Sequence, residues 1–195
     1  ETMKIDITNK KECKIIFEIK PDIIINTAAI TNVDYCEKFK KNDFDVNVKG
    51  TENISKIAAK LGSKLIHIST DAVFSGNKKF YVEEDEPNPI NIYGKTKLES
   101  EKIVSKVEDS IILRPSVIFG WFPSEYIKTS EESRKTMNFG LWVLDQLNKN
   151  NKISIVNDQF NTPTLADNMA KNILEILQKD MNGIFHLSGL SCISR

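Results

Sequence analysis

The chain has 195 residues, of which 40% are apolar and 28% are charged, and its 27 basic and 27 acidic side chains give a formal net charge of zero. The apolar share predicts a folded core, and the charge balance argues against a nucleic-acid partner. No apolar run reaches the roughly 18 residues of a membrane span, and we find no signal-peptide pattern. Three widely spaced cysteines fit neither a disulfide framework nor a metal site. We therefore expect a soluble cytoplasmic domain without a metal, a membrane partner or a nucleic-acid partner.

Short β-branched segments alternate with segments of helical periodicity along the whole chain. The spacing of Asn9 and Glu12 is typical of a helix cap, Pro21 closes that helix, and Gly62 ends the next one. The expected elements, in chain order, are a helix between Asn9 and Pro21, a strand at 22–26, a helix at 44–61, a strand at 64–69, a loop at 75–91, a helix at 91–107, a strand at 110–114, a loop or lid at 121–137, a helix at 138–149, a strand at 153–156, a helix at 166–179 and a strand at 184–187.

Five strands that alternate with helices predict an α/β fold built on a doubly wound parallel sheet, with helices on both faces. Folds of this kind bind their ligands outside the carboxyl ends of the strands. Candidate functional residues are therefore expected directly after each predicted strand.

Tyr93 and Lys97 lie four residues apart at the start of a predicted helix, in the segment Tyr-Gly-Lys-Thr-Lys. Residues at this spacing share one helix face, so the ammonium can lie near the phenol oxygen. A nearby positive charge lowers the pKa of a phenol, which would let Tyr93 exchange a proton with a substrate near neutral pH. The alternative is a surface tyrosine beside a solvated lysine, which is the more common explanation of an isolated Tyr-x-x-x-Lys pattern.

Two further segments follow predicted strands. The hydroxyl groups of Ser69 and Thr70 end the second strand, where they can hydrogen-bond a substrate oxygen or simply form a Ser/Thr turn. Small residues follow Asn26 at the end of the first strand, and they allow either a flat cofactor or a tightly packed helix to approach the backbone. His67 lies within an apolar strand and is expected to be a core histidine with satisfied hydrogen bonds.

Taken together, these segments resemble the extended short-chain dehydrogenase/reductase family, and within it the branch of the dTDP-4-dehydrorhamnose reductases. The resemblance covers nearly the whole chain, and its last two motifs are the more specific to this branch. The matching segments are Asn26-Thr-Ala-Ala-Ile-Thr-Asn-Val-Asp34, Asn47-Val-Lys-Gly-Thr51, Pro89-Ile-Asn-Ile-Tyr-Gly-Lys-Thr-Lys-Leu-Glu99, Ser69-Thr-Asp-Ala-Val-Phe74 and Asn157-Asp-Gln-Phe-Asn-Thr-Pro-Thr164.

The resemblance implies reduction of the 4-keto group of a dTDP-linked deoxysugar by NADPH or NADH. Tyr93 would protonate the C4 oxygen, Lys97 would hold the nicotinamide ribose and tune Tyr93, and Thr70 would hydrogen-bond the reacting carbonyl. The implied cofactor contacts are Asp6 and Ile7 at the end of a first strand, Ala28, Ala29, Ile30, Ser69, Tyr93, Lys97, Pro115 and Ser116. The implied substrate contacts are Thr31, Val33, Thr70, Asn138 and Gln159. A homodimer is compatible with the family.

The chain also departs from the family pattern. No G-x-x-G-x-x-G phosphate loop can be drawn through its eight glycines, so the Rossmann-like sheet is expected without its first strand–helix–strand unit. We expect an incomplete nucleotide-binding domain at 1–150 and a segment at 151–195 that supplies part of a small substrate lobe and the last strand. The long stretch 121–137 keeps an alternative open, a non-catalytic regulatory subunit similar to the β subunit of methionine adenosyltransferase.

Overall fold

The computed structural model describes residues 2–121 and 138–194, and they divide into two compact units. The first unit contains residues 2–114 together with Met181–His186. The second contains the other described residues, 115–121, 138–180 and 187–194. These units are defined by packing, whereas the division expected near residue 150 is one of function and stays a prediction.

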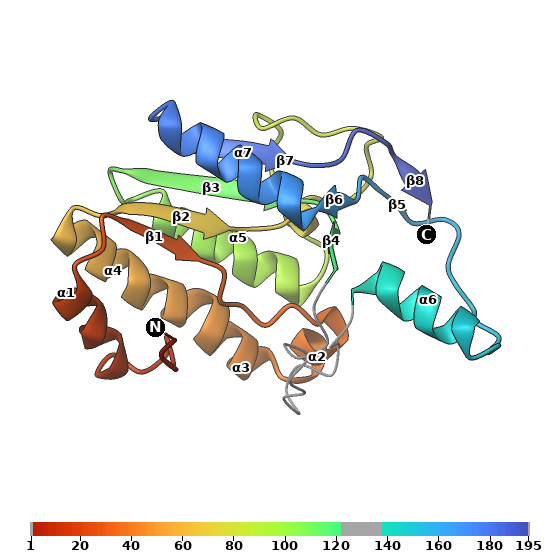
Figure 1. Ribbon diagram of the computed structural model, residues 1–195, viewed down its shortest axis with the longest axis horizontal. Helices are drawn as coiled ribbons and strands as arrows, with labels where there is room; N and C mark the ends of the chain where they lie inside the picture. Colours follow the sequence, from red (N-terminus) through yellow and green to blue (C-terminus); the bar gives the residue numbers. More distant parts are fainter. Residues whose placement is uncertain (1, 122–137, 195) are drawn as a thin grey trace. The chain divides into compact units, whose positions relative to one another are not determined.

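A four-stranded sheet with the order β1-β2-β3-β7 organises the chain (Figure 1). Its strands are β1 (Ile23–Asn26), β2 (Lys64–Ile68), β3 (Ser110–Pro115) and β7 (Gly183–Leu187). The pairs β1–β2 and β2–β3 are parallel, as expected, and β3 is buried along its whole length. β1 lies at the edge of the sheet, so Ile23 and Ile25 are 43% and 46% exposed, although the sequence predicted a buried strand.

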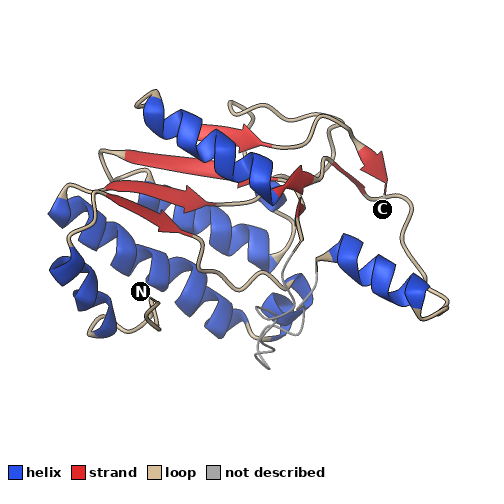
Figure 2. Cartoon of the chain, viewed as in Figure 1, coloured by secondary structure: helices blue, strands red, loops and turns tan. Residues whose placement is uncertain are grey.

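The helices of the first unit cover one face of this sheet, with α4 and α5 directly against it (Figures 1 and 2). In chain order this unit has a 3-10 turn (Glu12–Lys14), α1 (Ile15–Ile19), α2 (Val33–Lys38), α3 (Lys40–Phe44), a π-helical segment (Asp45–Gly50), α4 (Thr51–Leu61), a second 3-10 turn (Asp71–Val73) and α5 (Ile92–Val104). The buried core between sheet and helices consists of Cys13, Ile54, Ile57, Ala58, Leu65, Val104, Val107 and Ile112.

The second unit carries the short strands and the last two helices. Its elements are β4 (Ile118–Phe119), α6 (Phe139–Asn148), β5 (Phe160–Asn161), β6 (Thr164–Leu165), α7 (Ala166–Gln178) and β8 (Ile193–Ser194). β4 pairs with β6 in parallel, and β5 pairs with β8 in antiparallel fashion. Within the residues described, no helix is both long and apolar enough to cross a membrane.

Three local predictions are wrong. The segment 153–156 forms no strand, because no neighbouring strand pairs with its backbone and its side chains at Ile155 and Val156 stay 37% and 55% exposed. Residues 2–6 form no strand either. The helix predicted to begin at residue 44 begins earlier, because α3 runs directly into the π-helical segment, and no element was predicted for the residues of α2. The predicted lid at 121–137 lies, from residue 122 on, outside the described residues.

Candidate active site

The first turn of α5 carries Tyr93, and the next turn carries Lys97 on the same helix face. Asn91 begins the helix, since its Oδ1 accepts a hydrogen bond of 2.7 Å from the Gly94 amide. Tyr93 is half-buried, whereas Lys97 is only 1% exposed. The helix therefore presents the phenol toward its N-terminal end and encloses the amine one turn deeper in the protein.

Thr70 follows β2 and begins the 3-10 turn, whose Ala72 amide donates to Thr70 Oγ1 over 3.1 Å. Helix α5 approaches this turn very closely, because a Cβ atom on Gly94 would lie 2.2 Å from the Ala72 carbonyl oxygen. This approach brings the Thr70 hydroxyl close enough to Tyr93 to influence the pKa of its phenol. The structure thus joins the two residues that the sequence placed on separate elements.

Burial raises the pKa of Tyr93 above its ordinary value of 10, and the nearby Asp71, Cys36 and Asp43 act in the same direction. The hydrogen bond from Thr70 opposes this effect. The expectation of a lowered pKa for this phenol is wrong for the structure described, because desolvation of the phenolate outweighs the effects that lower the pKa. Tyr93 is consequently a neutral phenol at neutral pH, the protonation state of a proton donor.

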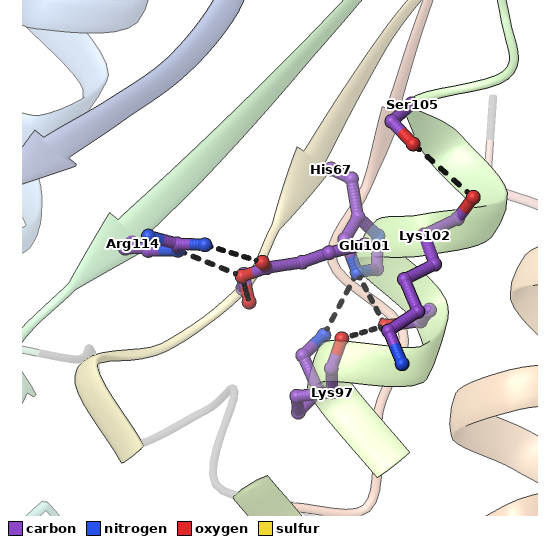
Figure 3. A network of polar contacts seen from close by, with 8 residues as sticks. His67, Lys97, Glu101, Lys102, Ser105 and Arg114 are labelled. Atoms are coloured by element: carbon purple, nitrogen blue, oxygen red, sulfur yellow. Dashed lines mark hydrogen bonds and ion pairs between the residues drawn. The ribbon is translucent and has the colours of Figure 1, made fainter. Parts of the chain in front are cut away.

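Lys97 points away from solvent and into the sheet (Figure 3). Its Nζ donates to the Ile68 carbonyl oxygen over 2.7 Å and lies 3.1 Å from His67 Nε2. Burial lowers the pKa of Lys97 to about 8, against the opposing charges of Glu101 and Asp43. Near neutral pH this amine is therefore close to its own titration midpoint and responds strongly to nearby charge.

His67 is fully buried, and its two ring nitrogens contact β1 on one side and α5 on the other. Nδ1 is 3.2 Å from Asn26 Nδ2, and Nε2 is 3.0 Å from Ser100 Oγ. The Ala28 amide donates to Asn26 Oδ1, so the amide nitrogen of Asn26 faces the ring as a donor. Burial and the charge of Lys97 hold the pKa of His67 well below 6.5. A core histidine was predicted, but its contact with Lys97 was not.

A buried ion pair fixes α5 to β3 one helical turn beyond Lys97, on the same face of the helix (Figure 3). Arg114 Nε and Nη2 donate to the Glu101 carboxylate over 3.0 and 2.8 Å, and both side chains are about 4% exposed. Ser69 Oγ donates to the same carboxylate. The hydroxyl of Ser69, an expected cofactor contact, is thus directed at Glu101. The Glu101–Arg114 ion pair was not predicted from the sequence.

The loop that follows β1 holds the expected contacts Ala28, Ala29, Ile30 and Thr31, and the expected contact Val33 comes directly after it. Asn47 fixes this loop, since its Oδ1 accepts from the Ile30 amide over 2.8 Å and its Nδ2 donates to the Ile30 carbonyl over 3.0 Å. Ala28 and Thr31 are exposed, and Val33, at the start of α2, is 39% exposed. This part of the chain therefore offers small, accessible groups after the carboxyl end of a parallel strand.

Asp6 and Ile7 lie in a turn and not at a strand end. Asp6 Oδ1 accepts from the amide and the hydroxyl of Thr8 over 2.9 and 2.8 Å. Ile7 packs against the core, and its carbonyl oxygen accepts from Asn53 Nδ2 over 2.9 Å. Asp6 remains exposed, whereas the side chain of Ile7 serves packing.

The four remaining candidates belong to the second unit or its boundary. Pro115 ends β3, and Ser116 is buried, with its carbonyl oxygen accepting from Thr164 Oγ1 over 2.6 Å. Asn138 begins α6, accepting from the Leu141 amide over 3.1 Å. Gln159 is exposed. Across residues 2–121 and 138–194, no three His, Cys, Asp or Glu side chains gather in a way that could hold a metal ion.

Several known proteins resemble this chain along most of its length. A family model described as RmlD substrate binding domain matches residues 1–195. A dTDP-4-dehydrorhamnose reductase of Aggregatibacter actinomycetemcomitans is 35% identical, over 98% of this chain and 64% of that protein. Methionine adenosyltransferase 2 subunit beta of Bos taurus is also 35% identical, over 90% of this chain and 52% of that protein. The chain therefore spans less than two thirds of these curated relatives.

A solved structure confirms the Rossmann-like fold class. The dTDP-4-dehydrorhamnose reductase of Bacillus anthracis str. Ames, crystallised in complex with NADP, superimposes with a TM-score of 0.87 at 31% identity, covering 97% of this chain and 64% of that one. Sequence and structure agree along the same residues: the chain belongs to the RmlD substrate binding domain family.

Proposed function

We propose that the protein containing this chain reduces dTDP-4-dehydrorhamnose to dTDP-rhamnose with NADPH or NADH. The neutral Tyr93 phenol, which lies beside Thr70 and one helical turn from the buried Lys97, is the observation behind this proposal. Proton donation by a positioned side chain is what reduction of a ketone to an alcohol requires. The likeness to named reductases over almost the whole chain supports the same reaction.

Each residue of this cluster has a distinct task in the proposal. Tyr93 donates its phenol proton to the C4 oxygen as negative charge develops there. Thr70 hydrogen-bonds the same oxygen and orients the carbonyl beside the phenol. Lys97, with a pKa lowered by burial to about 8, stabilises the phenolate that remains and passes it a new proton.

The residues present fit one end of a reduced nicotinamide dinucleotide, which supplies the hydride when bound. To hold the ribose, the buried Lys97 amine would have to turn from the Ile68 carbonyl oxygen toward the cofactor, whereas the accessible Ala28 already lets a flat group approach the backbone after β1. The proposed cofactor contacts are Asp6, Ile7, Ala28, Ala29, Ile30, Ser69, Tyr93, Lys97, Pro115 and Ser116. The proposed sugar-nucleotide contacts are Thr31, Val33, Thr70, Asn138 and Gln159.

We also propose a cellular compartment and an oligomeric state for the protein. A reaction on a sugar nucleotide with a reduced nicotinamide fits the cytoplasm, where we place the protein, and a homodimer is its proposed assembly. Sedimentation of the native protein distinguishes a dimer from a monomer.

The reaction is tested by mixing the native protein with NADPH or NADH and dTDP-4-dehydrorhamnose. The expected result is consumption of the reduced nicotinamide that depends on the sugar nucleotide, with dTDP-rhamnose as product. Binding of both ligands without turnover at any pH would overturn the assignment.

A regulatory role is the second candidate, because a methionine adenosyltransferase subunit beta is as similar to the chain as a named reductase is. In that case the native protein would bind a methionine adenosyltransferase catalytic subunit and alter its rate, with no turnover of the sugar nucleotide. Co-sedimentation with such a subunit decides between the two candidates.

A further inference from the structure

Asp43 on α3 has a side chain with no exposed surface, which is unusual for a carboxylate. Its hydrogen-bond partners are three neutral groups. Asn47 Nδ2 donates to Oδ1, Cys36 Sγ lies 3.3 Å from Oδ1, and Thr96 Oγ1 lies 2.9 Å from Oδ2. Burying a carboxyl group costs free energy, so the buried position of Asp43 depends on the hydrogen bonds that its side chain makes.

These contacts connect two parts of the candidate site. Asn47 also binds both backbone groups of Ile30, in the loop after β1. Thr96 Oγ1 lies 3.0 Å from the Tyr93 carbonyl oxygen, in the first turn of α5. Asp43 thus stands between the loop expected to meet the cofactor and the turn that carries the phenol.

We propose that Asp43 is a positioning residue, which holds the first turn of α5, and with it Tyr93, against the loop that follows β1. The inference rests on the proposed function, because a positioned phenol matters only if Tyr93 donates a proton. Asp43 acts through Thr96 and Asn47 and touches no reacting atom.

The charge of Asp43 gives this role a second signature. The titratable groups around its carboxyl are Cys36 and Glu37 on α2, and Tyr93 and Lys97 on α5. Burial raises the pKa of Asp43, and the Thr96 hydrogen bond opposes this. The ionised carboxylate raises the pKa of both Lys97 and Tyr93. Removing the charge without changing the shape must therefore lower both values.

Asp43→Asn separates geometry from charge. The amide can still accept from Asn47 and donate to Thr96, which then donates to the Tyr93 carbonyl oxygen. We expect kcat at neutral pH to stay within about threefold, since the first turn of α5 stays in place. The alkaline limb of the pH–rate profile should move to lower pH. Glu52→Gln, which makes the same change in the exposed Lys56 pair, should leave the limb in place.

Thr96→Val and Thr96→Ser test the anchoring without altering the charge. Valine keeps the shape of the side chain and removes the hydroxyl that joins Asp43 to the Tyr93 turn. It should lower kcat by about tenfold to 100-fold while the NADPH Kd changes by less than about twofold. Serine retains the hydroxyl and should restore most of the rate. Amide exchange at residues 94–97 should accelerate in Thr96→Val and in Asp43→Ala, and return toward the original rate in Thr96→Ser.

The outcomes separate the two proposals. If the native protein does not reduce the sugar nucleotide, the proposed function fails, and amide exchange at residues 94–97 still decides whether Asp43 and Thr96 hold the turn. If the native protein is active and Thr96→Val keeps its full rate and exchange protection, the positioning role is wrong. An Asp43→Asn profile that coincides with the wild-type profile would overturn the electrostatic part.

Discussion

Lys97 Nζ lies 3.1 Å from His67 Nε2, and neither side chain is more than 1% exposed. An ammonium and an imidazole this close cannot both hold a full charge away from water at low cost. The histidine stays neutral, and the pKa of Lys97 falls, through burial, to about 8. The lysine of the candidate site is therefore a titratable group near neutral pH.

The depressed pKa of Lys97 predicts a pH-dependent stability. The unfolded chain binds more protons than the folded chain between about pH 8 and the ordinary lysine value of 10.5, so stability rises with pH across this window. Lys97→Met removes the cost of the buried charge. Its gain in unfolding free energy over the wild type should be about 3 kcal/mol larger at about pH 7.5 than at about pH 10.5.

Urea denaturation at the two pH values measures this difference. Lys102→Met is the matched control, because it changes an exposed lysine of the same helix. A Lys97→Met difference that does not vary with pH would mean that the amine is solvated.

Tyr93→Phe should remove the proton donor and leave the rest of the site in place. We expect kcat to fall by about 10²–10⁴-fold, the usual contribution of a general acid, with the NADPH Kd nearly unchanged. Steady-state kinetics and a fluorescence titration of NADPH measure the two quantities. Lys97→Ala should weaken both, because the proposal gives its amine a role toward ribose and phenol alike. Full activity of Tyr93→Phe would refute the catalytic assignment.

Gly94→Ala should separate Tyr93 from Thr70. The added methyl group would lie 2.2 Å from the Ala72 carbonyl oxygen, a backbone atom that cannot move aside without shifting the 3-10 turn. We expect kcat to fall at least about tenfold through misplacement of the phenol. Gly140→Ala serves as the control, since its methyl group meets its nearest neighbour at an ordinary 3.5 Å. Equal rates for the two variants would show that α5 tolerates the displacement.

Arg114→Met should destabilise the fold by about 3–5 kcal/mol, because it leaves the Glu101 carboxylate buried without its charged partner. Lys102→Met, which breaks the exposed pair with Glu99, should change the urea midpoint far less. Similar midpoints for the two variants would mean that water reaches Glu101 in the native state.

The sequence predicted those features that depend on local pattern. The strand positions at β1, β2, β3 and β7 follow from β-branched runs, and the face shared by Tyr93 and Lys97 follows from helical spacing. The strand expected at 153–156 failed because an apolar run becomes a strand only where another strand pairs with it. Asn32 caps α2 through the Tyr35 amide, a local signal that was available and missed.

Features that depend on tertiary contacts could not be predicted from local pattern. The buried partners of α5 are of this kind, because Asp43 lies 53 residues from Thr96 and Glu101 lies 13 residues from Arg114. Composition alone marks such carboxylates as surface residues, so only their neighbours in space reveal that they are buried.

In the proposed reaction, Tyr93 supplies the proton to the C4 oxygen of the sugar, and the reduced nicotinamide would supply the hydride to C4. The most direct measurement uses NADPH deuterated on the transferred face of the nicotinamide, the native protein and dTDP-4-dehydrorhamnose, with the product examined by NMR. We expect dTDP-rhamnose with deuterium at C4, and almost no labelled product within the same time from Tyr93→Phe. Labelled product formed equally fast by Tyr93→Phe, or no labelled sugar from the native protein, would contradict the proposed reaction.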